Sequence, residues 1–345
     1  MISLLVVNYR SAALAANAIR TAREGTSAPL EVVVVDNSCD PPEADALRAV
    51  ADIVLAPDAN LGYARAINLG RRSCTGETLI VSNPDVTFAA GALDRLNAEL
   101  DANIAVAGPA LYWDDAFQWK LPPADLNTTS EKVDEVLASR AQNWFLQRDR
   151  RRIRKRTAFW SIERTTAVSA LSGAVLAIRA QDFDAVGGFD ERFQLYFEEI
   201  DFLRRIADRD KRIVYVPGAQ CRHLYNQSAG QDSGAAGVAY AQSELRYLEK
   251  WSGPFAARVL KRLERAPRRF EPQPIEGPIP LEGENLLVEV SPLPSFATAA
   301  GHFPQANSVD LPAEVWQTVG AQPLYFRVVE RDAARVIATY MRYAS

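Results

Sequence analysis

The sequence predicts an α/β protein: a doubly wound domain, with helices around a mostly parallel sheet, followed by a small β-rich appendage. Three observations support this prediction. Short apolar segments alternate with helical patterns through the first part of the chain, which is the order of parallel strands joined by right-handed crossovers. These segments are apolar along their whole length, as in strands that are buried on both faces. A proline-rich stretch then precedes a second group of strand-like segments.

Size and composition indicate a soluble globular protein of one large or two ordinary domains. The chain has 345 residues, is 48% hydrophobic and 24% charged, and has a net charge of −4, which gives no general attraction to nucleic acid. Its three cysteines are far apart and odd in number, which indicates a reducing compartment. The N-terminal apolar run is too short for a signal peptide, and residues 167–178 are fewer than the ~20 of a membrane span. We therefore expect a cytoplasmic protein that does not cross a membrane.

The hydrophobic patterns place the elements of the first domain in order. The predicted strands and helices alternate as Ile2–Val7, Ala12–Arg23, Glu31–Val35, Pro42–Ala51, Ile53–Leu55, Tyr63–Arg72 and Thr78–Ser82. In doubly wound sheets the ligand lies beyond the carboxyl ends of the strands. The residues of most interest therefore follow a strand directly, and they are Asn8-Tyr9, Asp36-Asn37 and Asn83-Pro84-Asp85.

Asp36 follows a valine-rich strand and is suited to accept hydrogen bonds from a ribose or from a base N–H. A turn or helix-cap residue would look the same in the sequence. The turn after the first strand contains no glycine, so the GxGxxG fingerprint of dinucleotide-binding domains is missing, and no GxxxxGK[ST] loop occurs. The missing glycines argue against an NAD-dependent oxidoreductase, and the missing loop excludes a P-loop protein.

Two further motifs are suited to a diphosphate. In NLGYARAIN, Gly62 lies where a loop enters a helix, so backbone N–H groups and Arg65 can face a phosphate, with Asn68 on the following turn. An ordinary loop-to-helix junction is the alternative. Beyond the fourth strand, Asp85 can hold a divalent cation through an oxygen ligand while a diphosphate supplies the others. Asn83 stands where a second acid would strengthen that prediction.

An acidic cluster in an aromatic setting lies near the middle of the chain, in the segment FDERFQLYFEEIDFLR. Its carboxylates are Glu198, Glu199 and Asp201, and Tyr196 and Phe197 are among the large rings around them. Burial beside aromatic rings raises the pKa of a carboxylate and suits it to accept a proton near neutral pH. The alternative is a helix N-terminus whose acids interact favourably with the helix dipole.

Seven blocks in this order resemble the inverting family-2 glycosyltransferases of the GT-A fold, in particular their rhamnosyltransferase-like branch. The blocks span roughly residues 1–250. They are VVNY at 6–9, VVDNS at 34–38, NLGYARAIN at 60–68, NPDV at 83–86, SGAVLAIR at 172–179, GGFDERFQLYFEEIDFLRR at 187–205 and CRHLYNQS around His223.

The resemblance implies a site for a nucleotide and a metal ion. Asp85 stands at the DxD position of the family and would bind the metal, and Asn83 would contact the ribose or the sugar. His223 would complete the metal site. The residues implied to bind the base, the ribose and the rest of the nucleotide are Val7, Asn8, Asp36, Arg65 and Asn68.

The resemblance also implies a catalytic base. The family uses a carboxylate pair of the form ED, and Glu199 falls at its second position. This chain has Glu where Asp is usual, which changes the reach of the side chain, so Glu198 and Asp201 remain alternatives.

The activity implied by the resemblance is the transfer of a sugar from a nucleotide-diphosphate donor, assisted by Mg²⁺ or Mn²⁺, to a glycan or lipid-linked acceptor in bacterial polysaccharide synthesis. The donor implied by the resemblance is dTDP-rhamnose. This assignment depends on the resemblance alone, since no residue of the sequence identifies the sugar or the base. A transferase for UDP-hexoses or UDP-galactofuranose is one alternative. A non-catalytic nucleotide-sugar-binding or assembly subunit is another, although such a subunit would need no base.

The segment Arg148 to Arg156 is the most basic part of the chain, with seven basic residues among nine. A solvated helix face is the ordinary interpretation. Because aromatic residues flank the segment, it can also rest on an anionic membrane surface or hold a lipid-linked diphosphate. We expect no nucleic-acid binding, since no recognition motif accompanies the basic run.

The sequence predicts three regions. Residues 1–265 form the GT-A domain, with a nucleotide-sugar half (1–110) and an acceptor and catalytic half (111–265) that contains the basic insertion. Residues 266–283 are a proline-rich linker. Residues 284–345 form the β-rich appendage, which is too small to bury a large core alone and so packs on the main domain or on a second subunit of a homo-oligomer. Its predicted strands are Leu286–Val290, Leu324–Glu330 and Arg335–Arg342, the last two paired as a hairpin.

Overall fold

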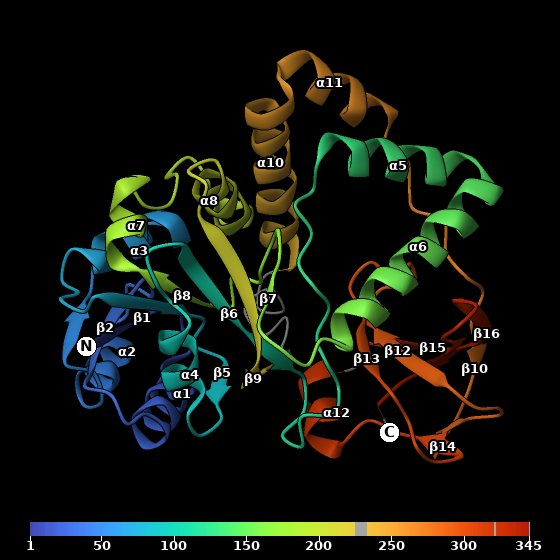
Figure 1. Ribbon diagram of the computed structural model, residues 1–345, viewed down its shortest axis with the longest axis horizontal. Coiled ribbons are helices and arrows are strands. Elements are labelled where there is room, and N and C mark those ends of the chain that lie inside the picture. The colour runs from blue at the N-terminus through green and yellow to red at the C-terminus, as the bar shows by residue number, and fades with distance from the viewer. Residues whose placement is uncertain (225–232, 321, 345) are drawn as a thin grey trace. The chain divides into compact units, whose positions relative to one another are not determined.

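The computed structural model describes residues 1–224, 233–320 and 322–344 (Figure 1). The chain divides into two compact units. The first comprises Met1–Leu111, Ala124–Leu126 and Glu163–Lys250, and the second comprises Tyr112–Pro123, Asn127–Ile162 and Trp251–Ser345.

The first unit is built on a mixed sheet. Among the described residues, its strands are β1 (Ile2–Asn8), β2 (Leu30–Asp36), β3 (Ile53–Leu55), β4 (Thr78–Ser82), β5 (Val86–Phe88), β6 (Ile104–Tyr112), β7 (Thr166–Ala167), β8 (Val175–Arg179) and β9 (Arg212–His223). Their order is β3-β2-β1-β4-β8-β6-β9-β5, with β7 paired to β9. The first four strands in that order are parallel, and β8 pairs antiparallel with β4. The predicted α/β class is confirmed: the strands from β3 to β4 form the parallel part of the sheet, and the pairings β4–β8, β5–β9 and β7–β9 are antiparallel.

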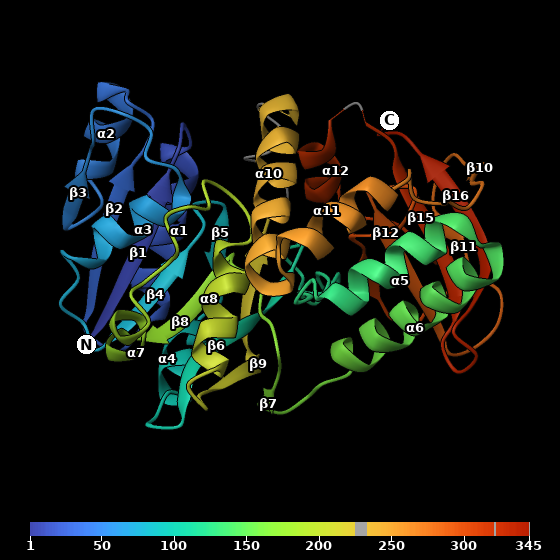
Figure 2. The same cartoon turned by 90° about the horizontal axis from the view of Figure 1, so that it is seen from above.

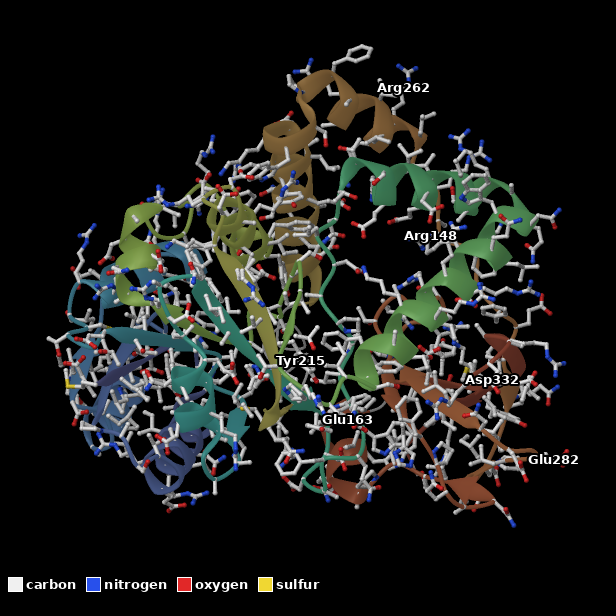
Figure 3. The ribbon with its side chains drawn as sticks, viewed as in Figure 1. Arg148, Glu163, Tyr215, Arg262, Glu282 and Asp332 are labelled. Atoms are coloured by element: carbon white, nitrogen blue, oxygen red, sulfur yellow. The ribbon has the colours of Figure 1, made fainter. Side chains whose placement is uncertain are left out.

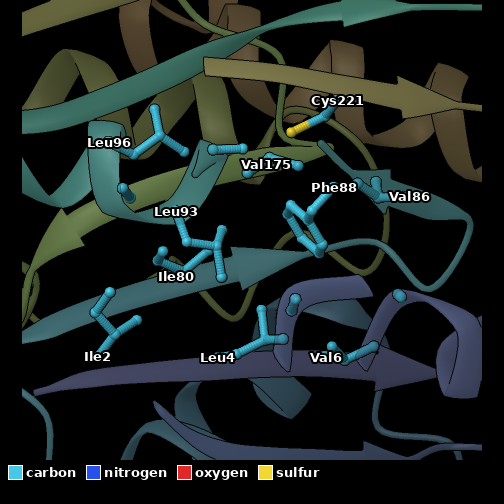
Figure 4. Packing of buried hydrophobic residues seen from close by; sticks show 14 of the residues in the cluster. Ile2, Leu4, Val6, Ile80, Val86, Phe88, Leu93, Leu96, Val175 and Cys221 are labelled. Carbon is cyan, nitrogen blue, oxygen red and sulfur yellow. The ribbon is translucent and has the colours of Figure 1, made fainter. Parts of the chain in front are cut away.

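Helices cover both faces of this sheet. They are α1 (Ala12–Gly25), α2 (Pro41–Arg48), α3 (Tyr63–Arg71), α4 (Ala92–Ala98), α7 (Ala180–Ala185), α8 (Glu198–Ala207) and α10 (Ser233–Ser252). On one face, Leu4 and Val6 of β1 pack in a hydrophobic cluster with α1 and α4 (Figure 4). On the other face, Gly70 of α3 leaves room for Leu5, because a Cβ at that position would collide with the leucine side chain. Burial on both sides explains why these strands are apolar throughout.

The strand order reverses beside β1. The chain proceeds from β1 to β2 and β3 on one side and then crosses to β4 on the other side. Asn8 pairs with Asp36 at the ends of β1 and β2, and Ser82 ends β4 beside Val6. A ligand of an open α/β sheet binds at such a reversal, beyond the carboxyl ends of the strands.

The second unit contains a five-stranded sheet among its described residues, with the order β10-β16-β15-β12-β13. Its strands and helices, including those of a separate two-stranded sheet, are α5 (Thr129–Arg140), α6 (Gln142–Trp160), α11 (Pro254–Leu263), β10 (Gln273–Pro274), β11 (Ile279–Pro280), β12 (Leu286–Ser291), β13 (Ala300–His302), β14 (Ser308–Val309), α12 (Ala313–Val319), β15 (Leu324–Glu330) and β16 (Arg335–Arg342). β15 and β16 pair antiparallel, which confirms the predicted hairpin. Figure 2 shows α6 beside this sheet, seen from above.

The two units differ from the predicted division. The C-terminal strands do not stand alone after a linker, because Asn127–Ile162 belongs to the same compact unit. Ile153 and Trp160 of α6 are buried in one cluster with Leu287 and Val329 of the sheet. The insertion therefore supplies the apolar surface that the appendage lacks by itself.

Buried ion pairs join α6 to the sheet and account for part of the basic segment. Glu289 of β12 accepts hydrogen bonds from Arg156 and from Arg327, each at 2.6 Å, and Arg327 also contacts Asp149 at 2.9 Å. Burial raises the pKa of Glu289, but the two guanidinium groups outweigh it and hold that pKa below its ordinary value.

Most other basic residues of the segment also have partners within the unit. The groups that pair with a carboxylate or a carbonyl oxygen are Arg148, Arg151, Arg152 and Lys155. Arg150 and Arg154 are exposed and have no ion pair among the described residues. The high charge of the segment thus reflects internal pairing more than a free basic face.

Candidate active site

Asp85 and His223 come together through strand pairing. Asp85 lies between β4 and β5, and His223 is the last residue of β9. Since β5 and β9 are antiparallel with Val86 opposite His223, the Asp85 side chain lies next to the imidazole. Nε2 of His223 is 3.2 Å from Oδ1 of Asp85. Residues 225–228, the end of the CRHLYNQS block, lie outside the described residues.

The surroundings of Asp85 suit a divalent cation. The residue is 5% exposed, and its Oδ1 receives no well-aligned hydrogen bond from the described part of the chain. Burial raises the pKa of Asp85, but His223 outweighs it, so the pKa lies below its ordinary value and the group is a carboxylate at neutral pH. A carboxylate oxygen and an imidazole nitrogen are both ligands of Mn²⁺, Mg²⁺ or similar ions.

Asn83 and Tyr63 extend this pair. Nδ2 of Asn83 lies 3.4 Å from Nε2 of His223, and the hydroxyl of Tyr63 donates to Oδ1 of Asn83 at 3.4 Å. No three His, Cys, Asp or Glu side chains gather into a metal cluster within the described ranges. The described residues therefore offer one carboxylate, one imidazole and one neighbouring amide at this place.

The carboxylates of the acidic cluster lie at the start of α8. Phe197 precedes the helix with a φ of 69°, and Tyr196 has a φ of 68°. Two consecutive non-glycine residues in the left-handed region are strained, and such strain persists only where the surroundings hold the backbone. Glu198 and Glu199 follow at once, so the strained turn directs the candidate base.

Both glutamates have a raised pKa. Burial raises the pKa of Glu198 well above its ordinary value, and the neighbouring charge of Glu199 adds to the effect. Burial also raises the pKa of Glu199, although hydrogen bonds from backbone N–H groups oppose it. Glu198 is 4% exposed, whereas Glu199 is partly exposed even though its Oε2 is buried. Of the two, Glu199 is the more exposed to solvent.

The loop before β8 connects the two halves of the site. The backbone N–H of Asn83 donates to the carbonyl of Ala174 at 2.9 Å. The adjacent Gly173 lies against Glu199, because a Cβ added to it would be 2.9 Å from Cγ of that glutamate. The block SGAVLAIR thus has a defined position in the site, which the sequence did not reveal.

Tyr63 is a site residue that the sequence analysis did not single out. Burial raises the pKa of its hydroxyl, and the charges of Glu198, Glu199 and Asp85 raise it further. All three acids therefore act on one hydroxyl, which stays protonated and can donate a hydrogen bond. Its position directly after Gly62, at the first residue of α3, was the available signal.

Asp201, an alternative base, is fully buried in ion pairs. Its Oδ2 accepts from Nε of Arg205 at 2.8 Å, and its Oδ1 lies 2.6 Å from Nζ of Lys250. Lys250 also contacts Asp190 at 2.8 Å, and Arg205 donates to the carbonyl of Gly188 at 2.8 Å. Both oxygens of Asp201 thus bind cations that hold the loop before α8, which removes it from the candidates for the base.

Asn68 has a similar structural role. Its Oδ1 accepts from the backbone N–H of Phe189, and its Nδ2 donates to the Phe189 carbonyl, both at 2.9 Å. Asn68 therefore clamps the loop before α8, and its amide is not free for a nucleotide. Arg65, one turn earlier, is exposed and lies 3.8 Å from Glu191. An exposed pair at that distance contributes little, so its guanidinium remains available.

The residues after β1 and β2 lie at the predicted sheet edge but bind one another. Nδ2 of Asn8 donates to Oδ1 of Asp36 at 2.9 Å and also reaches Glu43 at 2.9 Å, while its Oδ1 accepts from the Ser11 hydroxyl at 2.9 Å. Val7 is buried and paired in the sheet. The amide of Asn8 therefore joins the strand ends, and Asp36, which is 1% exposed, is bonded to that amide and to the backbone N–H of Ser38.

Comparison with known proteins gives matches in sequence and in structure. Residues 3–170 match the family model described as Glycosyl transferase family 2. An N-acetylglucosaminyl-diphospho-decaprenol L-rhamnosyltransferase from Mycobacterium tuberculosis is 27% identical over 245 residues, 65% of this chain and 76% of that protein. Rhamnosyltransferase WbbL from Escherichia coli is 30% identical over 90 residues, 26% of this chain and 34% of that protein. Mannosyltransferase PcManGT from Pyrobaculum calidifontis, solved with GDP-Man and Mn²⁺, has a TM-score of 0.49 and 17% identity, covering 75% of this chain and 69% of that one.

No helix in the described ranges combines the length and the apolar character that crossing a bilayer requires.

Proposed function

The chain belongs to glycosyltransferase family 2, and on that premise we propose that it transfers a sugar, with inversion, from a nucleotide-diphosphate donor to a hydroxyl group of a lipid-linked glycan. The observation that carries this proposal is a chain of contacts that joins the two halves of the site. Gly173 lies against Glu199, the carbonyl of the next residue, Ala174, accepts from the backbone N–H of Asn83, and Asn83 lies 3.4 Å from His223, which contacts Asp85. A carboxylate beside an imidazole and a pair of carboxyls with raised pKa values thus share one site. That combination suits the departure of a diphosphate and the removal of a proton from an acceptor.

Asp85 and His223 are the residues that would hold a divalent cation, Mg²⁺ or Mn²⁺. When bound, such a cation neutralises the charge that develops on a leaving diphosphate. The chain supplies the rest of the setting. Asn83 and Tyr63 offer hydrogen bonds beside the pair, and Arg65 adds an exposed positive charge at the start of α3.

Glu199 is the proposed base. Its partly exposed side chain can accept the proton of the acceptor hydroxyl as that oxygen attacks the anomeric carbon. The bond from the anomeric carbon to the diphosphate breaks, its electron pair leaves with the nucleotide, and the configuration is inverted. Glu198 is the more buried of the two, and burial together with the charge of Glu199 raises its pKa, so a proton held on Glu198 would limit the negative charge beside Glu199.

The proposed donor is dTDP-rhamnose and the proposed acceptor is a lipid-linked diphospho-sugar. Two relatives are named as rhamnosyltransferases, and the name of one includes an N-acetylglucosaminyl-diphospho-decaprenol. We propose that the reaction takes place at the cytoplasmic side of a membrane, where a soluble donor meets such an acceptor.

A panel of donors tests this function. The full chain is incubated with Mg²⁺ or Mn²⁺ and with dTDP-rhamnose, UDP-hexoses or UDP-galactofuranose, and released nucleoside diphosphate is measured with and without a short polyprenyl-diphospho-sugar. We expect release from dTDP-rhamnose that rises with acceptor and stops with EDTA. Release from a UDP-sugar alone would reassign the donor.

The same panel addresses the non-catalytic alternative. Donor binding without release under any of these conditions would favour a nucleotide-sugar-binding subunit. The Glu199→Gln variant serves as the control for contaminating hydrolase activity, since release that persists in it does not come from the proposed site.

A further inference from the structure

An exposed apolar stripe runs along α11 in the second unit. Phe255, Val259 and Leu263 are spaced by four residues and therefore share one side of the helix. Their exposed fractions are 80%, 40% and 37%. Ala257 and Leu260 of the same helix are buried, so α11 already packs through its other side. A second apolar side open to solvent is not needed for folding and indicates an interaction.

The neighbouring helix α5 enlarges this surface. The Thr129 hydroxyl at the start of α5 hydrogen-bonds to Ser252, just before α11. At the other end, Nη2 of Arg140 donates to the carbonyl of Leu263 at 2.9 Å. The two helices therefore lie side by side and run in the same direction (Figures 1 and 2). α5 contributes further apolar side chains, 41% and 38% exposed, which are Val133 and Leu137.

Positive charge accompanies the apolar stripe. Residues 251–269 contain six basic residues and one acid, in a chain whose net charge is −4. The one acid, Glu264, pairs with two lysines. Arg258 and Arg262 follow Phe255 and Val259 by three residues, so they stand beside the stripe. Both are exposed and form no ion pair within the part of the chain that the structure describes, and Figure 3 shows Arg262 on the outer side of α11.

We propose that this apolar–basic face, formed by α11 and the adjoining part of α5, binds the surface of an anionic lipid bilayer. Aromatic and aliphatic side chains enter the boundary between headgroups and acyl chains, while arginines beside them meet lipid phosphates. The concentration of one sign of charge argues for this occupant. A second copy docked through the same face would bring two faces of the same positive charge together, which repel one another.

The proposed membrane contact lies on α11 and not on the basic segment of α6. In that segment only Arg150 and Arg154 are exposed without an ion pair among the described residues, whereas α11 combines free arginines with exposed apolar side chains. The inference agrees with the proposed lipid-linked acceptor, but vesicle binding can be measured without any sugar.

Vesicle flotation of the full chain tests the proposal. We expect the protein to float with vesicles of phosphatidylcholine and phosphatidylglycerol and not with phosphatidylcholine alone. Phe255→Ser/Val259→Ser and Arg258→Glu/Arg262→Glu should each lower the bound fraction by about tenfold or more. Because these side chains are exposed, the variants should keep the wild-type circular dichroism and melting temperature.

Two matched controls define the surface. Arg150→Glu/Arg154→Glu makes the same charge change on α6, and Ile337→Ser replaces an apolar side chain that is 46% exposed on β16. Both controls should bind vesicles like the wild type. Equal flotation with both lipid mixtures, loss of binding only in the α6 variant, or a dimer that Phe255→Ser/Val259→Ser dissociates without any vesicle binding would each overturn the proposal.

Nucleoside diphosphate release by the same variants separates this proposal from the proposed function. Vesicle binding by a protein that releases no nucleotide from any donor would contradict the transfer reaction and support the membrane face. Donor turnover without vesicle binding would support the transfer reaction and contradict the membrane face.

Discussion

Nε2 of His223 lies 3.2 Å from Oδ1 of Asp85, across the pairing of β5 with β9. Asp85 is buried, and its Oδ1 has no well-aligned hydrogen bond from the described residues. Asp85 and His223 are the residues proposed to hold a divalent cation. Asp85 follows β4, which lies next to β1, where the strand order of the sheet reverses.

Asp85→Asn should weaken Mn²⁺ binding in the presence of nucleoside diphosphate by at least about tenfold. Loss of a residue that only contacts a metal ligand already lowers metal affinity by roughly tenfold or more, and Asp85 is proposed to be a ligand itself. The amide keeps the shape of the carboxylate but removes its charge. Titration calorimetry measures the affinity without turnover. Glu163→Gln, which neutralises an exposed carboxylate of the same unit, is the control. An unchanged affinity in Asp85→Asn would place the cation elsewhere.

Glu199→Gln should lower kcat by roughly 10²–10⁴-fold, the usual contribution of a general base, and leave the dissociation constant of the donor nearly unchanged. Glu198→Gln should lower kcat less, because Glu198 is the more buried of the pair. Steady-state kinetics and donor titration give both quantities. Wild-type turnover by Glu199→Gln together with an inactive Glu198→Gln would move the base by one residue.

Gly173→Ala should lower kcat without changing donor affinity. The new Cβ would lie 2.9 Å from Cγ of Glu199, so the glutamate has to move away from its present position. Overpacking of this kind also costs about 1–3 kcal/mol of stability. Gly237→Ala is the matched control, since a Cβ there has no atom within 4 Å. Equal loss of kcat in both variants would mean that the effect is not local.

The pH dependence should reflect the raised pKa values of the glutamates. Because burial raises the pKa of Glu199, the acid limb of kcat/KM should lie above 4.5, the ordinary value for glutamate. Activity should rise as the pH passes through this raised value, since the deprotonated form is the base. An acid limb at or below the ordinary value would contradict the assignment.

The free energy of unfolding should also depend on the pH through these glutamates, and it should fall as the pH rises, whereas the activity rises. A group whose pKa is raised by folding contributes stability that is present below its unfolded pKa and is lost as the pH rises through the folded pKa. The wild type should therefore lose stability relative to Glu198→Gln between pH 4.5 and the raised pKa. Urea unfolding at several pH values measures the difference, and a constant difference would be evidence against the burial of this charge.

Glu289→Ala should destabilise the second unit by about 3–5 kcal/mol, because it leaves the buried Arg156 and Arg327 without their shared carboxylate. Glu282→Ala, at an exposed position, should change stability little. Thermal unfolding with a probe in the second unit measures both. A small effect of Glu289→Ala would mean that solvent reaches this network after the substitution.

Local patterns determined the elements and the approximate position of the site. The predicted bounds of β3, β4, β15 and β16 agree with those in the structure, because each is a hydrophobic run between polar or turn residues. The acids at the start of α8 and Asp85 were identified from residue types next to predicted strands and helices, whereas His223 was implied by the resemblance to the family. Such signals depend on neighbours in the sequence.

Only the tertiary structure decided which polar groups are free. The sequence left Asp201 open as an alternative to Glu199, yet Asp201 is neutralised by Arg205 and Lys250, whereas Glu199 lies against Gly173. Likewise, most basic residues of α6 have internal partners, because Glu289 of β12 and carboxylates of α5 pair with them. The physical reason is the same in each case: the charge, the pKa and the availability of a buried side chain depend on partners that are distant along the chain.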